Sequence, residues 1–167
     1  MAKIKVELIE NFLVVWNHAE GSQLYKTGFY GKPLGIPKPK IPEFKVPLLL
    51  DLMEGLYLVE KKKIAIYEET ENHKVGLRKL RQKAMQLYDE FEEKYAVYRD
   101  LRDNNLIVTP GIKFGCDFAV YKYVEESHFN YYGKMMFKWV YWNLMLNGNE
   151  LPLENQMNMA GKMRQSI

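Results

Sequence analysis

The sequence has few of the residues that build disulfides and thiolate metal sites. Its 167 residues include one cysteine, Cys116, and three histidines. A single thiol cannot form an intramolecular disulfide, and without a cluster of cysteine or histidine ligands it cannot complete a thiolate zinc site. We therefore expect Cys116 to be a small buried strand residue, and we expect the chain to use no metal or other cofactor.

Long hydrophobic runs are also missing. No segment approaches the roughly 18 uninterrupted apolar residues of a membrane-spanning helix, and the first ten residues, MAKIKVELIE, lack the apolar block of a signal peptide. Apolar residues nevertheless make up 47% of the chain and aromatic residues 14%, which is enough to bury a core. We predict a soluble cytoplasmic protein with no membrane partner.

The charge is mildly basic, with a net value of +3. That total does not by itself indicate a nucleic-acid-binding protein. The cations cluster at residues 61–63 and within residues 74–83 (KVGLRKLRQK), where they are able to neutralise phosphates. A solvated helix face has the same composition, so both interpretations stay open.

The N-terminal half has the pattern of a small α+β domain. The expected elements are strands within residues 4–15, a helix over 17–27 with Gly28 as a left-handed cap, an extended loop over the proline-rich 31–47, a helix beginning at Leu49, and a strand over 63–67.

The C-terminal half continues with two helices and several strands. A basic helix is expected around residues 77–82. A longer one should bury a stripe from Leu87 to Leu101, with Asp89, Glu92, Glu93, Arg99 and Arg102 on its other faces. Asn104 and Asn105 should end this helix. The remaining expected elements are strands over 106–109, 113–115, 117–121 and 131–142, and a helix over 151–167.

The most specific stretch lies between Tyr98 and His128. It contains YRDLRD at residues 98–103, PGIKFGCDFAVY at 110–121, and then His128. Two earlier segments, LYKTGFYGKP at 24–33 and LMEGLYLVEKKKIAI at 52–66, complete the pattern. In this order the blocks resemble the archaeal tRNA-splicing endonucleases.

The resemblance implies an α+β fold with two domains. A small N-terminal α/β-mixed domain would cover residues 1–84. A restriction-endonuclease-like nuclease domain, with helices packed on a mixed sheet, would cover 85–167. Because the chain ends at Ile167, we expect that sheet to lack the last strands of the family.

The resemblance also implies a metal-independent catalytic site. Tyr121 matches the family's general base and His128 its general acid, whose near-neutral intrinsic pKa suits proton transfer. Tyr123 is a neighbouring competitor for the tyrosine role. We predict 2′,3′-cyclic phosphate and 5′-hydroxyl ends.

The third family group, a lysine, has no exact match. In the aligned segment Gln165 stands at the lysine and Asn158 at an arginine. Lys162 lies three positions earlier, which turns it about 60° away on a helix. It is the candidate cation, and Arg164 is a weaker one.

Partners follow from the resemblance as well. Glu125 and Glu126 occupy the place of an acidic loop that docks into a basic cleft on another subunit. We expect a homomeric or heteromeric dimer or tetramer that cleaves precursor tRNA at bulge-helix-bulge junctions. Two rivals remain: a non-catalytic structural subunit of the same enzyme, and a metal-dependent DNA nuclease, which no paired-carboxylate motif beside Asp117 supports.

Overall fold

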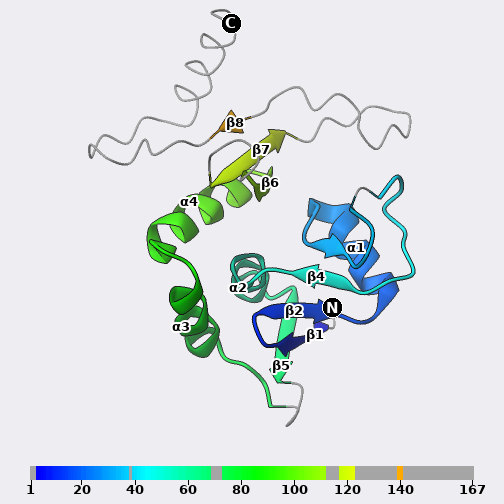
Figure 1. The fold of residues 1–167 in the computed structure, drawn as a ribbon, viewed down its shortest axis with the longest axis horizontal. Coiled ribbons are helices and arrows are strands. Elements are labelled where there is room, and N and C mark those ends of the chain that lie inside the picture. Colours follow the sequence, from blue (N-terminus) through cyan, green and yellow to red (C-terminus); the bar gives the residue numbers. More distant parts are fainter. Residues whose placement is uncertain (1–2, 38, 69–72, 112–116, 123–138, 141–167) are drawn as a thin grey trace, which may run out of the picture.

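The computed structural model describes residues 3–37, 39–68, 73–111, 117–122 and 139–140 (Figure 1). Its elements, in chain order, are β1 (Ile4–Ile9), β2 (Phe12–Val15), α1 (His18–Gly28), β3 (Lys32–Pro33), β4 (Leu48–Leu50), α2 (Leu52–Glu60), β5 (Ile64–Glu68), α3 (Leu77–Leu87), α4 (Phe91–Asp103), β6 (Leu106–Pro110), β7 (Phe118–Lys122) and β8 (Trp139–Val140). The prediction of an α+β fold is confirmed. No helix within the described ranges is both long and apolar enough to cross a membrane.

The N-terminal strands form a five-stranded sheet in the order β3-β4-β2-β1-β5. Only the β1–β5 pair is parallel. Alternate residues of the central strands, such as Val6 and Leu13, are fully buried on one face. Helix α2 packs closely against that face, since a Cβ on Gly55 would meet the side chains of Leu13 and Ile66.

Helix α1 ends differently from our expectation. Asn17 caps its start by accepting hydrogen bonds from the amides of Ala19 and Glu20. The left-handed cap at its end is Phe29, with φ of 53°, and the prediction of Gly28 as that cap is wrong. Gly28 is instead required by close packing, because a Cβ there would lie 2.3 Å from the ring of Tyr30.

Helix α2 starts later than the hydrophobic spacing predicted. Leu49 lies in β4, so its place in the helix is a wrong prediction. Asp51 and Glu54 form a capping box: the Glu54 amide donates to Asp51 Oδ1 at 2.7 Å, and the Asp51 amide donates to Glu54 Oε2 at 3.2 Å. This reciprocal pair begins the helix at Leu52.

The proline-rich segment contains one short strand that we did not expect. In β3, Lys32 pairs with Leu49 and Pro33 pairs with Leu48 of β4. β3 is at the edge of the sheet, where a proline without an N–H group is tolerated.

Helices α3 and α4 connect the N-terminal sheet to β6 and β7 (Figure 1). Leu87, expected in the second helix, is the last residue of α3, and Glu90 with φ of 54° separates the helices. The rest of the predicted stripe, Phe91, Tyr95, Tyr98 and Leu101, is buried, but the predicted burial of Leu87 is wrong because that residue is 46% exposed.

We predicted that Arg102 lies on a face of the helix away from the buried stripe. This prediction is wrong, because the residue is only 5% exposed. The physical reason is a set of polar partners enclosed beneath the helix, among them the carbonyl groups of Gly28 and Val108.

Helix α4 ends where the sequence predicted. Asn104 is its C-cap, and Asn105 adopts φ of 58° with its amide donating to the Arg102 carbonyl. Strands β6, β7 and β8 then form an antiparallel sheet in that order. The strand expected over 131–142 is described only at β8. Cys116, the strand expected over 113–115 and the helix expected over 151–167 lie outside the described residues. The division of the chain at residue 84 stays a prediction.

The packing around Gly28 makes a stability prediction. Gly28→Ala places a methyl group into the buried Tyr30 ring, and overpacking of this kind should lower the free energy of unfolding by about 1–3 kcal/mol. Gly76→Ala is the control, because a Cβ there meets no atom within 4 Å. Urea unfolding measures both variants, and equal losses would contradict the close-packing argument.

Candidate active site

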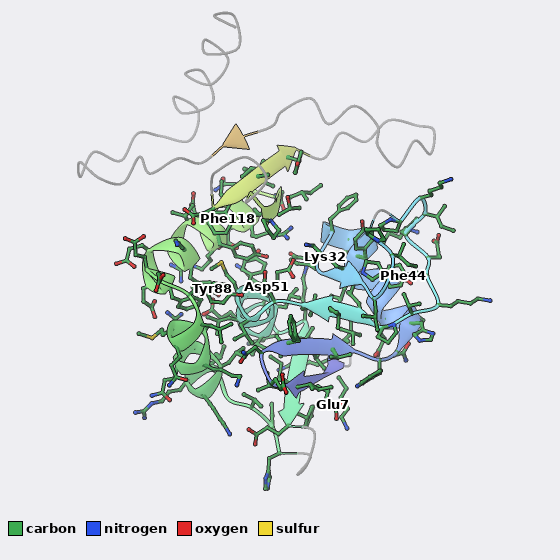
Figure 2. All side chains as sticks on the ribbon, in the orientation of Figure 1. Glu7, Lys32, Phe44, Asp51, Tyr88 and Phe118 are labelled. Atoms are coloured by element: carbon green, nitrogen blue, oxygen red, sulfur yellow. The ribbon has the colours of Figure 1, made fainter. Side chains whose placement is uncertain are left out.

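Tyr121, the candidate general base, lies on the hairpin formed by β6 and β7. It pairs with Ile107, while the preceding residue Val120 pairs with Val108. Val108 and Val120 are buried in the core, and the ring of Phe118 lies 5.9 Å from that of Tyr98 in α4 (Figure 2). Because side chains alternate along a strand, Tyr121 is on the face turned away from α4, where it is half-buried.

The beginning of β7 is held in place on two sides. The Gly111 amide donates to the Asp117 carbonyl at 3.0 Å, which closes the described part of the hairpin. The Asp117 carboxylate also forms a salt bridge with Lys94 of α4, with 3.2 Å between Oδ1 and Nζ. The salt bridge and the ring contact between Phe118 and Tyr98 link this end of β7 to α4.

The other predicted site residues are not among those that the structure describes. His128, Lys162, Glu125 and Glu126 all lie outside the described residues, as do the alternatives Tyr123 and Arg164. Their roles stay predictions. Within the described ranges, no group of three His, Cys, Asp or Glu side chains is arranged to hold a metal ion.

Arg102 lies behind the hairpin, and its guanidinium group donates hydrogen bonds to three different elements or side chains. Its Nη2 donates to the carbonyl of Val108 in β6 at 3.0 Å, and its Nη1 donates to the carbonyl of Gly28 at the end of α1 at 2.7 Å. Its Nε donates to the Tyr98 hydroxyl at 3.0 Å. One buried guanidinium thus joins the N-terminal sheet domain to the strand beside Tyr121.

Aromatic rings and a carboxylate surround the same guanidinium. The Arg102 carbon Cζ lies 4.2 Å from the ring centre of Tyr30 and 5.3 Å from that of Tyr98. Glu54 Oε1 is 3.8 Å from Nη2 and accepts a hydrogen bond from the Gly31 amide at 3.0 Å. The buried charge therefore has a cation–π partner in Tyr30, hydrogen-bond acceptors, and the Glu54 carboxyl group nearby.

Burial changes the protonation of this cluster. Burial raises the pKa of Glu54 to about 8, and the neighbouring Asp51 carboxylate adds to the increase. The Gly31 and Asp51 amides and Arg102 act in the opposite direction but do not outweigh it. Burial also raises the pKa of the Tyr98 hydroxyl well above its usual value, so Tyr98 stays neutral.

A second junction joins the end of α4 to the N-terminal domain near Arg102. Asp103 Oδ1 accepts a hydrogen bond from the Tyr57 hydroxyl of α2 at 3.0 Å and lies 2.6 Å from Lys61 Nζ. The consecutive residues 102 and 103 therefore both hold the end of α4 against the N-terminal domain.

Several of the clustered cations form ion pairs within the structure. Lys79 pairs with Glu68, and Arg81 bridges Glu60 and Glu92. Lys61 is already engaged by Asp103. These ion pairs favour a structural role for part of each basic cluster.

Sequence reasoning singled out Tyr121 as a candidate but did not recognise that Arg102 is buried. A usable signal was present in the spacing. Arg102 follows Tyr98 by four residues, which places both on one side of a helix, and Tyr98 belongs to the buried stripe. The partners that make burial tolerable, Gly28 and Val108, are distant or on another element, and the spacing does not reveal them.

The sequence matches the models of a known protein family. The model of the tRNA intron endonuclease N-terminal domain matches residues 4–81, and the model of the catalytic C-terminal domain of the same family matches residues 91–136. These two domains are those of an RNA-processing endonuclease. The chain belongs to the tRNA intron endonuclease family, and the predicted resemblance is confirmed.

Individual relatives agree with the family models. The chain is 44% identical over 119 residues to a tRNA-splicing endonuclease of Hyperthermus butylicus, a match that covers 71% of this chain and 65% of the relative. A tRNA-splicing endonuclease of Sulfurisphaera tokodaii is 40% identical over 116 residues, covering 69% and 63%. One of Sulfolobus acidocaldarius is 40% identical over 119 residues, covering 71% and 65%. The chain therefore spans less than two thirds of the length of these relatives.

The bonds of Arg102 predict a large stability loss on its removal. Arg102→Met would leave the Gly28 and Val108 carbonyls without a donor and Glu54 without its cation. Breaking such a buried network should lower the free energy of unfolding by about 3–5 kcal/mol. Arg99→Met, on the exposed side of the same helix, is the matched control and should change it by less than about 0.5 kcal/mol. Similar urea midpoints for the two variants would refute the role of Arg102.

The raised pKa of Glu54 predicts an unusual pH dependence. A carboxyl that binds its proton more tightly in the folded chain makes the free energy of unfolding fall as pH rises from about 4.5 to about 8. Glu54→Gln does not titrate but keeps an oxygen for the Gly31 amide. Urea unfolding between about pH 5 and pH 8 should show a decline in the parent that the variant lacks. Parallel pH profiles would show that Glu54 titrates normally.

Proposed function

We propose that the chain is a subunit of a tRNA-splicing endonuclease that cleaves precursor tRNA at its intron–exon junctions. The observation that carries the proposal is the match of residues 91–136 to the family's catalytic domain, because this segment includes both Tyr121 and His128. The relatives named tRNA-splicing endonuclease support the same activity and substrate. The enzyme would act in the cytoplasm on bulge-helix-bulge RNA, which proteins recognise largely by shape and splayed-out bases.

The proposed chemistry is an internal transesterification, which would classify the enzyme as an RNA lyase. Tyr121 removes the proton of the 2′-hydroxyl, and the 2′-oxygen attacks the adjacent phosphorus. The bond from phosphorus to the 5′-oxygen breaks as His128 protonates that oxygen. A cation, for which Lys162 is the candidate, stabilises the negative charge that develops on the phosphoryl oxygens. The products are a 2′,3′-cyclic phosphate and a 5′-hydroxyl, and no metal or other cofactor takes part.

The position of Tyr121 supports its role. It lies on the face of β7 that α4 does not cover, and its side chain is not part of the hydrophobic core cluster of the described residues. Lys94 pairs with Asp117, directly before this strand, and Arg102 bonds to Val108 of the neighbouring strand β6. A base needs this combination of a fixed backbone and an accessible functional group.

The enzyme would act as an assembly of subunits. Glu125 and Glu126 would form an acidic loop that docks against a basic surface of another subunit, where opposite charge favours one orientation. We propose a dimer or tetramer, with one domain over residues 1–84 and the nuclease domain over 85–167.

A structural subunit of the same endonuclease is the second candidate. In its favour, the alignment that the resemblance implies beyond the matched segment places Gln165 at the family's lysine and Asn158 at its arginine. Without that cation, the chain would bind and position a catalytic partner chain and would not cut RNA itself.

A cleavage assay distinguishes these functions. With a bulge-helix-bulge RNA in EDTA, the chain should produce 2′,3′-cyclic phosphate ends. His128→Ala should lower the cleavage rate by about 10²- to 10⁴-fold while RNA binding is retained. His18→Ala, an exposed histidine at the start of α1, is the control.

Each outcome supports one function. Loss of cleavage in EDTA with recovery in magnesium would refute the metal-independent mechanism. Cleavage only after a partner chain is added, at a rate that His128→Ala does not change, would assign the structural role.

A further inference from the structure

The N-terminal sheet has one face that the described helices leave open. A Cβ on Gly55 of α2 would contact Leu13 and Ile66, and a Cβ on Gly21 of α1 would contact Leu48, so both helices pack on the same face. Residues that alternate with these point to the opposite side. We call that side the outer face, and it contains Val14, which is buried but is not part of the main core cluster.

Strand register places one continuous row of side chains across the outer face. Neighbouring residues in adjacent strands point to the same side of a sheet. In order across the sheet, the paired residues of this row are Lys32, Leu49, Val14, Glu7, Tyr67 and Lys74. With strands about 4.8 Å apart, the row is about 24 Å long.

Large aromatic side chains lie beside this row. Phe12, in the same strand as Val14, is 58% exposed, and Trp16, directly after the end of that strand, is 55% exposed. The Trp16 Nε1 donates to Glu7 Oε2 at 2.5 Å, so the edge of its ring is held to the sheet. The Nζ of Lys5, in the neighbouring row, lies 5.1 Å from the ring centre of Tyr67. Three aromatic rings are thus presented on one surface.

The charges of the row suit a polyanion. Lysines occupy both ends, Lys32 on β3 and Lys74 beside β5, and Lys5 adds a third cation near the middle. Glu7 is the one carboxylate of the row and already accepts the bond from Trp16. Aromatic rings between cations match the alternation of bases and phosphates in a single strand.

From this arrangement we propose that the outer face binds unpaired RNA. Bases would stack on Trp16, Phe12 and Tyr67, and the phosphates would lie near Lys32, Lys74 and Lys5. The inference rests on the proposed function and deepens it. It assigns to the N-terminal sheet a binding site for single-stranded nucleotides of the substrate, separate from the Tyr121 site.

Binding of a short RNA tests the proposal without any need for cleavage. The probe is a fluorescein-labelled strand of about ten nucleotides with no internal pairing. It is 2′-O-methylated, so it lacks the nucleophile for cleavage. Fluorescence anisotropy with the full chain should show saturable binding. Phe12→Ser combined with Trp16→Ser should weaken this binding by about tenfold or more, because stacking contributes strongly to single-strand affinity.

Matched variants test whether a loss of RNA binding is specific to the outer face or follows from removing any exposed apolar side chain. Leu34→Ser with Ile41→Ser removes two comparably exposed apolar side chains from the segment between β3 and β4, and should leave the affinity unchanged. Trp16→Phe should retain most of the binding because a ring remains. Lys32→Gln with Lys74→Gln should reduce the slope of log affinity against log salt by about 0.7 for each phosphate that is no longer neutralised.

The results have distinct meanings. Equal affinities for the parent and the Phe12/Trp16 variant, with both folded by circular dichroism, would overturn the proposal. The proposal would also be overturned if the Phe12/Trp16 variant sedimented as a monomer where the parent is an oligomer, and yet bound RNA as tightly as the parent. The outer face would then be a protein interface. A chain that binds the methylated RNA through this face but never cuts a bulge-helix-bulge substrate would refute the proposed catalysis and leave the binding inference standing.

Discussion

The structure depends on one buried cation, the guanidinium of Arg102. It bonds to the end of α1 through the Gly28 carbonyl, to strand β6 through the Val108 carbonyl, and to its own helix through the Tyr98 hydroxyl. A charge with this little exposure is tolerated when its hydrogen-bond donors are satisfied. Each partner must therefore be in place at the same time, and the junction between the two halves has little freedom to shift.

The same requirement organises the surroundings of Arg102. Glu54 caps α2, accepts a hydrogen bond from the Gly31 amide and lies 3.8 Å from the guanidinium, so the start of the helix, the loop and the cation meet at one carboxyl group. Gly28 must lack a side chain because Tyr30 lies across it, and Tyr30 in turn covers Arg102. Arg102 also bonds to the carbonyl group of Val108 in β6, and β6 pairs with β7, which contains Tyr121. The candidate base is thus positioned from the N-terminal domain, through backbone carbonyls.

The two proposed RNA-binding regions differ in how far local sequence reveals them. Tyr121 is recognisable from its motif, since the strand, the turn and the tyrosine are contiguous. The outer face has no such motif. Lys32, Val14, Glu7 and Tyr67 come from four separate strands, and only the pairing of those strands brings them into one row. Exposure of Phe12 and Trp16 likewise depends on which side of the sheet α1 and α2 occupy.

Local patterns determined most of the described element types, the buried stripe of α4, its end at Asn104 and Asn105, and the family. Those features depend on spacing and on residues close together in the chain. Local patterns failed at Gly28, Leu49 and Arg102, where the outcome depends on the Tyr30 ring, on the Asp51–Glu54 capping box beside β4, and on distant carbonyl groups. Only the tertiary structure decided these, because the free energy of burying a charge or omitting a Cβ depends on partners that the chain brings together by folding.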